Sequence, residues 1–159
     1  MVTPAHAHPK SDSEMLQLAQ ARCKSRGVQL TPIRRKVLEI LHSHENGLKA
    51  YELLACIQEH QANATPPTVY RALDFLIEHG LVHKIESINQ FIACRHESHP
   101  QPELFMICRH CGKITELHDH ALMQALMDCI RKTGHQPDCR EVEVTTTCPD
   151  CLPAPNVSV

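Results

Sequence analysis

The stretch that decides the fold is ATPPTVYRALDFLIEHG, residues 64–80. Thr65 followed by two prolines is typical of a helix start, because threonine caps the first turn and proline fits where no backbone N–H is needed. Apolar residues then recur at helical spacing and form one stripe: Val69, Leu73, Leu76 and Ile77. Gly80 is typical of a helix end. The stretch therefore predicts a helix with one buried face and one polar face.

The segments on either side complete a known order of elements. Upstream, start signals and apolar spacing predict three helices, beginning near Ser13, Pro32 and Lys49. Downstream, LVHKIE and NQFIAC are short strand-like runs separated by Ser87-Ile88, which predicts a β-hairpin. Three or four helices that close on a hairpin are typical of a winged helix.

The second half of the chain alternates strands with a helix. Residues 104–108 and 113–118 predict two strands around a turn, residues 121–132 a helix, and residues 141–147 a further strand. The predicted fold class is α+β: an N-terminal winged helix followed by a C-terminal α/β domain. The boundary falls between about residues 86 and 99.

Composition narrows the class of protein. The 159 residues include only 3% aromatic residues and no Trp, so two small modules would need a staple such as a metal or a partner subunit. No apolar signal-peptide core or membrane span is visible, which predicts a cytosolic protein. Nine cysteines and thirteen histidines in a reducing compartment favour metal binding over disulfides. The net charge of −2 permits a DNA-binding module without requiring one.

Two CxxC pairs are the strongest chemical motif. CRHC and CPDC supply four thiols, which match the tetrahedral four-cysteine sites that hold structural zinc: Cys108, Cys111, Cys148 and Cys151. The 36 residues between the pairs form strand, helix and strand, which can return the chain to its starting edge. Two alternatives remain open: unrelated thiols, and a redox dithiol, although the latter usually begins a helix.

A second group of ligand-type residues gathers at the presumed junction of the two modules. Its members are His83, Cys94, His96, His99, Glu116, His118 and His120. Imidazole and thiolate together favour zinc over magnesium or calcium, because thiolate is a soft ligand. Taken singly, His83 can be a solvated wing residue, Cys94 a small core residue and Glu116 an edge charge.

The run TPPTVYRALDFLIEHGLVHKIES followed by CxxCG resembles the ferric uptake regulator superfamily of dimeric bacterial metalloregulators, and its zinc-sensing branch in particular, over about residues 15–151. The resemblance implies a DNA-binding winged helix over residues 1–86 with a tail over 1–12. A hinge over 87–95 and a zinc-stapled dimerisation domain over 96–159 would follow. It also implies a homodimer that binds an inverted-repeat operator and is not an enzyme.

The resemblance further implies two zinc ions per chain. One is held by the four cysteines, and a regulatory ion by His83, Cys94, His99 and Glu116, with His96 as the alternative to His99 because the intervening segment differs in length. A third, weak site can involve His96, His118 and His120. The helical spacing turns Thr68 and Arg71 outward, and Tyr51, Thr68, Tyr70 and Arg71 are the predicted DNA-binding residues, with Arg34 and Arg35 as phosphate contacts.

The expected function is a zinc-responsive repressor of zinc uptake genes, with zinc as the corepressor that clamps the dimer. An iron or peroxide sensor of the same superfamily is the first alternative. A zinc hydrolase would require a substrate pocket and a general base, and no HExxH motif is present. A redox protein would leave the CxxC thiols free of metal.

Overall fold

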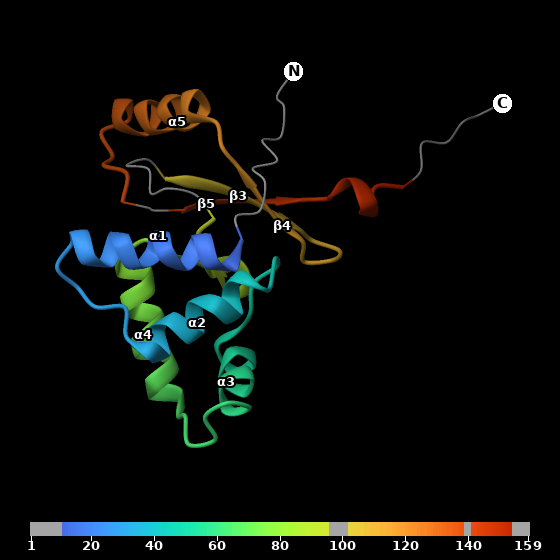
Figure 1. Cartoon of the computed structure of the whole chain (residues 1–159). Helices are drawn as coiled ribbons and strands as arrows, with labels where there is room; N and C mark the ends of the chain where they lie inside the picture. Colours follow the sequence, from blue (N-terminus) through green and yellow to red (C-terminus); the bar gives the residue numbers. More distant parts are fainter. Residues whose placement is uncertain (1–10, 96–101, 139–140, 154–159) are drawn as a thin grey trace. The chain divides into compact units, whose positions relative to one another are not determined.

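The computed structural model describes residues 11–95, 102–138 and 141–153 (Figure 1). These residues divide into two compact units, one within residues 7–98 and one within residues 99–159. In the described ranges, none of the helices combines the length and hydropathy that a membrane crossing requires.

The N-terminal unit consists of four helices followed by a two-stranded hairpin (Figure 1). The two strands run antiparallel to each other, with His83 opposite Ile92. The order confirms the predicted winged helix. Its elements are α1 (Asp12–Ser25), α2 (Pro32–His42), α3 (Ala50–Gln58), α4 (Pro66–Glu78), β1 (Val82–Ile85) and β2 (Gln90–Ala93).

Local capping differs from the sequence expectation in two places. Ser11, not Ser13, caps α1: its hydroxyl accepts from the Glu14 N–H at 3.3 Å, and the Glu14 carboxylate accepts from the Ser11 N–H at 3.1 Å. At α4 the Thr65 hydroxyl lies 3.1 Å from the Thr68 hydroxyl and makes no cap to the backbone. The two prolines still occupy the first turn, where proline is favoured.

One hydrophobic core joins all elements of the N-terminal unit. Its most deeply buried members are Val37, Leu41, Leu53, Leu73 and Leu76. The hairpin is tied in by a short bridge, in which Leu48 and Phe91 exchange backbone hydrogen bonds of 3.0 and 2.8 Å. Gly47 has a φ of +71°, and a Cβ there would overlap Ile92 and the Phe91 carbonyl, so only glycine fits. The wing is therefore packed against the helices.

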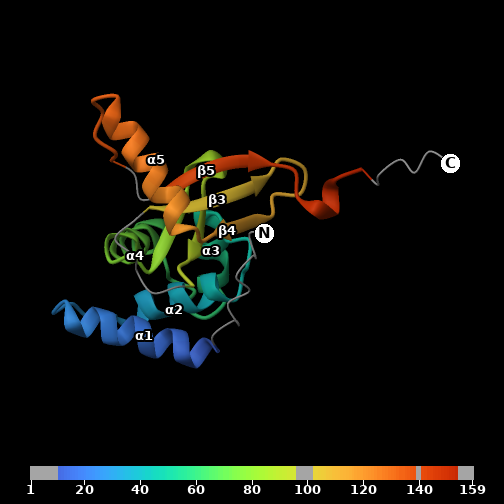
Figure 2. The ribbon, with the colours of Figure 1, turned by 90° about the horizontal axis from the view of Figure 1, so that it is seen from above.

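The C-terminal unit is a three-stranded sheet with one helix (Figure 2). Met123 and Met127 of that helix are buried and pack with Leu104 of the central strand. The strand order is β4-β3-β5, antiparallel on one side and parallel on the other. The elements are β3 (Glu103–Cys108), β4 (Ile114–Leu117), α5 (His120–Lys132), β5 (Glu141–Thr146) and a 3-10 turn over Pro149–Cys151.

The parallel pairing of β3 with β5 places their carboxyl ends side by side. Cys108, the last residue of β3, is in register with Thr146, the last residue of β5. The CRHC turn follows β3 directly, and the CPDC turn begins two residues after β5. The two motifs, far apart in sequence, thus follow the sheet at the same end, where the carboxyl ends of β3 and β5 lie.

Candidate metal centres and nucleic-acid interface

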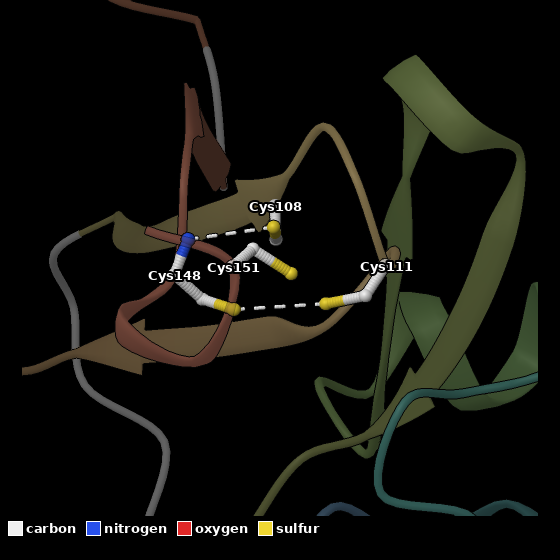
Figure 3. Close-up of side chains that lie close together, drawn as sticks. All are labelled: Cys108, Cys111, Cys148 and Cys151. Atoms are coloured by element: carbon white, nitrogen blue, oxygen red, sulfur yellow. Dashed lines mark hydrogen bonds between the residues drawn. The ribbon is translucent and has the colours of Figure 1, made fainter. Parts of the chain in front are cut away.

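The two CxxC turns bring four sulfurs together, as the spacing predicts (Figure 3). The Sγ atoms of Cys108, Cys111, Cys148 and Cys151 all lie within 4.8 Å of one another. Cys111 Sγ and Cys148 Sγ are 3.6 Å apart. A zinc ion with four sulfurs at 2.3 Å requires sulfur–sulfur separations of about 3.8 Å. The donor type, number and spacing fit structural zinc.

Backbone hydrogen bonds shape both turns. The Cys108 N–H donates to the Lys113 carbonyl at 2.9 Å, and the Gly112 N–H donates to the Cys108 carbonyl at 2.9 Å. In the second turn the Cys151 N–H donates to the Cys148 carbonyl at 2.9 Å. Lys113 Nζ lies 3.0 Å from Asp150 Oδ2, an ion pair that links the two turns. The cysteines are therefore placed by the main chain.

The protonation of the cluster is uneven. Backbone N–H groups, the Cys148 N–H at 3.4 Å first among them, lower the pKa of Cys108 to about 5. Hydrogen bonding to the thiols of Cys148 and Cys111 raises the pKa of Cys151 to about 12, and burial raises the pKa of Cys148. Four crowded thiols lose their protons together only when a cation balances the charge, which is what Zn²⁺ supplies.

The hairpin of the N-terminal unit carries two predicted ligands of the regulatory site. His83 lies opposite Ile92, and the Cys94 N–H donates to the Leu81 carbonyl at 2.9 Å. Cys94 is two residues from Ile92, so His83 and Cys94 point to the same face of the hairpin. Their donor atoms lie within 4.8 Å of each other. His83 is buried and Cys94 half-buried, so the pair is a preformed, protected nitrogen and sulfur donor set.

The other predicted ligands belong to the C-terminal unit or lie outside the described residues. Glu116 is half-buried on β4, and its Oε1 is 3.1 Å from His118 Nε2. His118 and His120 line a hollow together with Glu103. His96 and His99, the alternatives for the fourth regulatory ligand, both lie outside the described residues.

Glu103 is a candidate ligand that the sequence pattern does not predict. It is a buried carboxylate, 7% exposed, at the start of β3 and in register with Glu141. A buried carboxylate is costly unless it is hydrogen-bonded or bound to a cation, so the position favours a polar role. The signal available in the sequence is a glutamate that opens an otherwise apolar strand, ELFMIC.

The predicted DNA-binding residues lie on the N-terminal unit. Tyr70 and Arg71 are exposed on α4, opposite the buried face formed by Val69, Ala72, Leu73 and Leu76. Thr68 is half-buried in the first turn. Tyr51 is 66% exposed at the start of α3. A phenol this exposed contributes little to a core, which favours a surface role.

Comparisons with known proteins agree with this geometry. Residues 25–145 match the model of the ferric uptake regulator family. The zinc uptake regulation protein of Escherichia coli (strain K12) is 35% identical over 140 residues, which is 87% of this chain and 82% of that protein. A ferric uptake regulation protein of Synechocystis is 28% identical over 142 residues, 84% of this chain and 82% of that protein. Among solved structures, a zinc uptake regulator complexed with zinc and DNA superposes with a TM-score of 0.80 at 34% identity, covering 89% of this chain and 95% of that one.

Proposed function

The chain belongs to the ferric uptake regulator family, and from this premise we propose that it is a zinc-responsive, DNA-binding transcriptional repressor of zinc uptake genes. Zinc acts as the corepressor and favours the dimer geometry that binds DNA. The protein works in the cytoplasm, as a regulator rather than an enzyme. Two zinc ions bind per chain, one structural and one regulatory.

The observation that carries the proposal is the position of His83 and Cys94. Both lie on the hairpin that follows α4 directly, and their donor atoms are within 4.8 Å of each other. A soft thiolate beside an imidazole favours zinc over manganese and over ferrous iron, whose sites are richer in carboxylate. His99 and Glu116 complete the proposed site, as the family resemblance implies.

DNA binding is assigned to α4 and the start of α3. The N-terminal residues of a recognition helix usually lie nearest the base edges in the major groove, and Thr68, Tyr70 and Arg71 occupy that part of α4. Arg71 is exposed and can donate two hydrogen bonds to a guanine. Tyr51 can contact a phosphate or a thymine methyl group. The solved relative complexed with zinc and DNA supports DNA binding as a function of this chain.

A second copy of the chain is the proposed partner of the C-terminal unit. In the described sheet β5 is an edge strand, since the order is β4-β3-β5. Val144 on β5 is 43% exposed and Leu122 on α5 is 46% exposed. An edge strand with exposed apolar side chains is a surface that a partner strand can cover. A homodimer would place two recognition helices on an inverted repeat.

The regulatory step requires only a difference in zinc affinity between two states. Shifting a population from 1:99 to 99:1 takes about 5.5 kcal/mol of differential binding. A site that is complete in one state and incomplete in the other can supply this. By linkage, operator DNA tightens zinc binding by the same factor.

The test compares Cys94→Ser with Cys129→Ser, a matched control because Cys129 is exposed on α5. A DNA duplex selected by the zinc-loaded protein from a random pool is the probe. We expect Cys94→Ser to lose the zinc dependence of DNA binding while remaining a folded dimer. Cys129→Ser should behave as wild type. Normal zinc-dependent binding by Cys94→Ser would rule out this regulatory site.

Metal identity is tested by titrating zinc, iron and manganese separately in the same assay. Zinc should activate binding at the lowest free concentration. Glu103→Gln and Glu116→Gln distinguish the two candidate carboxylate ligands: the variant in which zinc activates DNA binding less has lost the ligand. Activation by iron instead of zinc would favour the alternative, an iron sensor of the same family.

A further inference from the structure

Three arginine side chains surround the last turn of the recognition helix α4. Arg22 Nη2 donates to the Gly80 carbonyl at 2.9 Å and lies 3.4 Å from the His79 carbonyl. Arg26 Nη1 donates to the His79 carbonyl at 3.0 Å. The Arg34 guanidinium stacks on the Phe75 ring, 3.5 Å from its centroid. The recognition helix is thus held at its end by both α1 and α2.

The chemistry of a helix end explains these contacts. The last carbonyls of a helix have no partner within the helix and carry partial negative charge, so guanidinium groups are favoured there. Arg22 is half-buried, which strengthens the interaction relative to a fully exposed pair. Gly80 has a φ of +66°, and a Cβ at this position would lie 3.2 Å from Arg22 Nη2. The turn and the arginine fit closely.

The same turn leads directly into the proposed regulatory site. The Leu81 N–H donates to the Leu76 carbonyl of α4 at 2.8 Å. The Leu81 carbonyl accepts from the Cys94 N–H at 2.9 Å. His83 follows two residues later. One residue is therefore hydrogen-bonded to the recognition helix on one side and to a proposed zinc ligand on the other.

Arg34 of α2 contributes to the same cluster. Its Nη1 donates to the Gln29 carbonyl at 2.7 Å while its guanidinium covers Phe75. Phe75 in turn contacts the His79 ring, with centroids 4.3 Å apart. Side chains from α1, α2 and α4 thus converge on one turn.

We infer that Arg22 and Arg26 are positioning residues that couple the regulatory zinc to the recognition helix. They hold the α4–β1 turn in place. When zinc orders His83 and Cys94, the orientation of α4 is therefore fixed as well. The inference rests on the proposed function. It assigns α1 a role in regulation, although α1 carries none of the proposed zinc or base contacts.

The test measures coupling, not affinity alone. Arg22→Gln, Arg22→Lys and the control Lys24→Gln are compared with wild type. Lys24 is exposed in the same turn of α1, and its change removes the same charge. For each full-length protein, affinity for the selected DNA duplex is measured with saturating zinc and with zinc chelated. Zinc affinity without DNA and the thermal midpoint complete the set.

For Arg22→Gln we expect the ratio of the two DNA affinities to fall about tenfold, a typical size for an allosteric coupling. Zinc affinity of the DNA-free protein should stay near the wild-type value. Arg22→Lys should recover part of the ratio, since an ammonium can still donate to a carbonyl. Lys24→Gln should leave it unchanged.

An unchanged ratio in Arg22→Gln would overturn the inference while leaving the proposed function intact. Equal weakening of DNA binding in both zinc states would also overturn it, because that indicates a purely structural role. If Lys24→Gln lowers the ratio of the two DNA affinities as much as Arg22→Gln does, the effect is due to charge alone and the inference is overturned. Should Arg22→Gln not fold, Arg22→Lys decides by the same ratio. A wild-type protein without zinc dependence would remove both proposals.

Discussion

The two units of this chain are stabilised in different ways. The N-terminal unit buries apolar side chains from four helices and a hairpin in one core. The described C-terminal unit buries fewer apolar side chains: Leu104, Met123 and Met127 form a cluster with four partly buried neighbours, and Phe105 and Ile107 of β3 are also buried. The same unit holds four cysteines at a zinc-like spacing. Packing alone can stabilise the first unit, whereas the second also offers four thiols that a stabilising metal can bind.

The largest expected effect separates the two units. Cys148→Ser removes a ligand of the four-cysteine site, and structural zinc is worth on the order of 10 kcal/mol in small metal-dependent domains. We expect amide protection to be lost over residues 102–153 and retained over residues 11–95. Hydrogen exchange with mass spectrometry checks this. Retained protection in both units would show that the C-terminal core stands without metal.

A pair of core truncations tests the difference in packing. Leu73→Ala should cost about 4 kcal/mol in the N-terminal unit, because a fully buried leucine leaves a cavity that cannot collapse easily. Met127→Ala should cost about 2 kcal/mol in the smaller cluster of α5 and β3, because the side chain is flexible and most members of the cluster are only partly buried. Denaturant unfolding, followed by hydrogen exchange at individual amides, measures the loss of unfolding free energy in each unit. Equal costs would weaken the comparison.

Two glycines with the same backbone conformation give a further test of the difference between the two units. Gly47 and Gly112 have φ values of +71° and +72°. Gly47→Ala should cost about 3 kcal/mol, since strain is joined by overlap with β2. Gly112→Ala should cost about 1 kcal/mol, because its Cβ meets nothing within 4 Å among the described residues. Thermal unfolding of the zinc-loaded proteins provides the measurement.

A further expected effect is the pH dependence of zinc binding at the four-cysteine site. Cys148 and Cys151 have raised pKa values and hold protons at neutral pH, so zinc must displace them. Apparent zinc affinity should rise with pH between 6 and 8, by roughly tenfold per unit for each proton displaced. If the unit unfolds without zinc, all four thiols have ordinary pKa values near 8.5, so zinc affinity still rises with pH and Cys108 contributes to the slope as well.

Chelator competition in the Cys94→Ser background isolates this site for the pH measurement. If the unit is folded without zinc, Cys108, with its pKa lowered to about 5, is already a thiolate in this range and adds no slope. An affinity that does not change between pH 6 and 8 would show that the thiols are ionised before zinc arrives.

Sequence patterns predicted what depends on local spacing. The apolar stripe from Val69 to Ile77 predicted α4, and the paired CxxC motifs predicted a four-cysteine cluster that the structure confirms. The resemblance to the family is confirmed over most of the chain. The proposed zinc ligands and DNA contacts, the hinge over residues 87–95 and the third metal site stay predictions; within that hinge, residues 90–93 form β2.

What sequence patterns missed depends on contacts between distant residues. Glu103 resembles any strand-end charge, and only its burial distinguishes it. Arg22 and Arg26 occupy the ordinary place for basic residues at the end of a helix, yet they donate to carbonyls more than 50 positions away. Ser11 caps α1 where Ser13 was expected, because both serines fit the pattern and only one meets the Glu14 N–H.

The place of the second CxxC pair, after β5, also sets an order of assembly. On the ribosome, every residue of the N-terminal unit emerges before Cys148 and Cys151 have been translated. The N-terminal unit can therefore fold during synthesis. The four-cysteine cluster can form only after Cys148 and Cys151 have been translated, and only then can it bind an ion. In a zinc-starved cell, newly made chains would carry a folded N-terminal unit and a C-terminal unit without its metal, exposed to proteases until zinc is supplied.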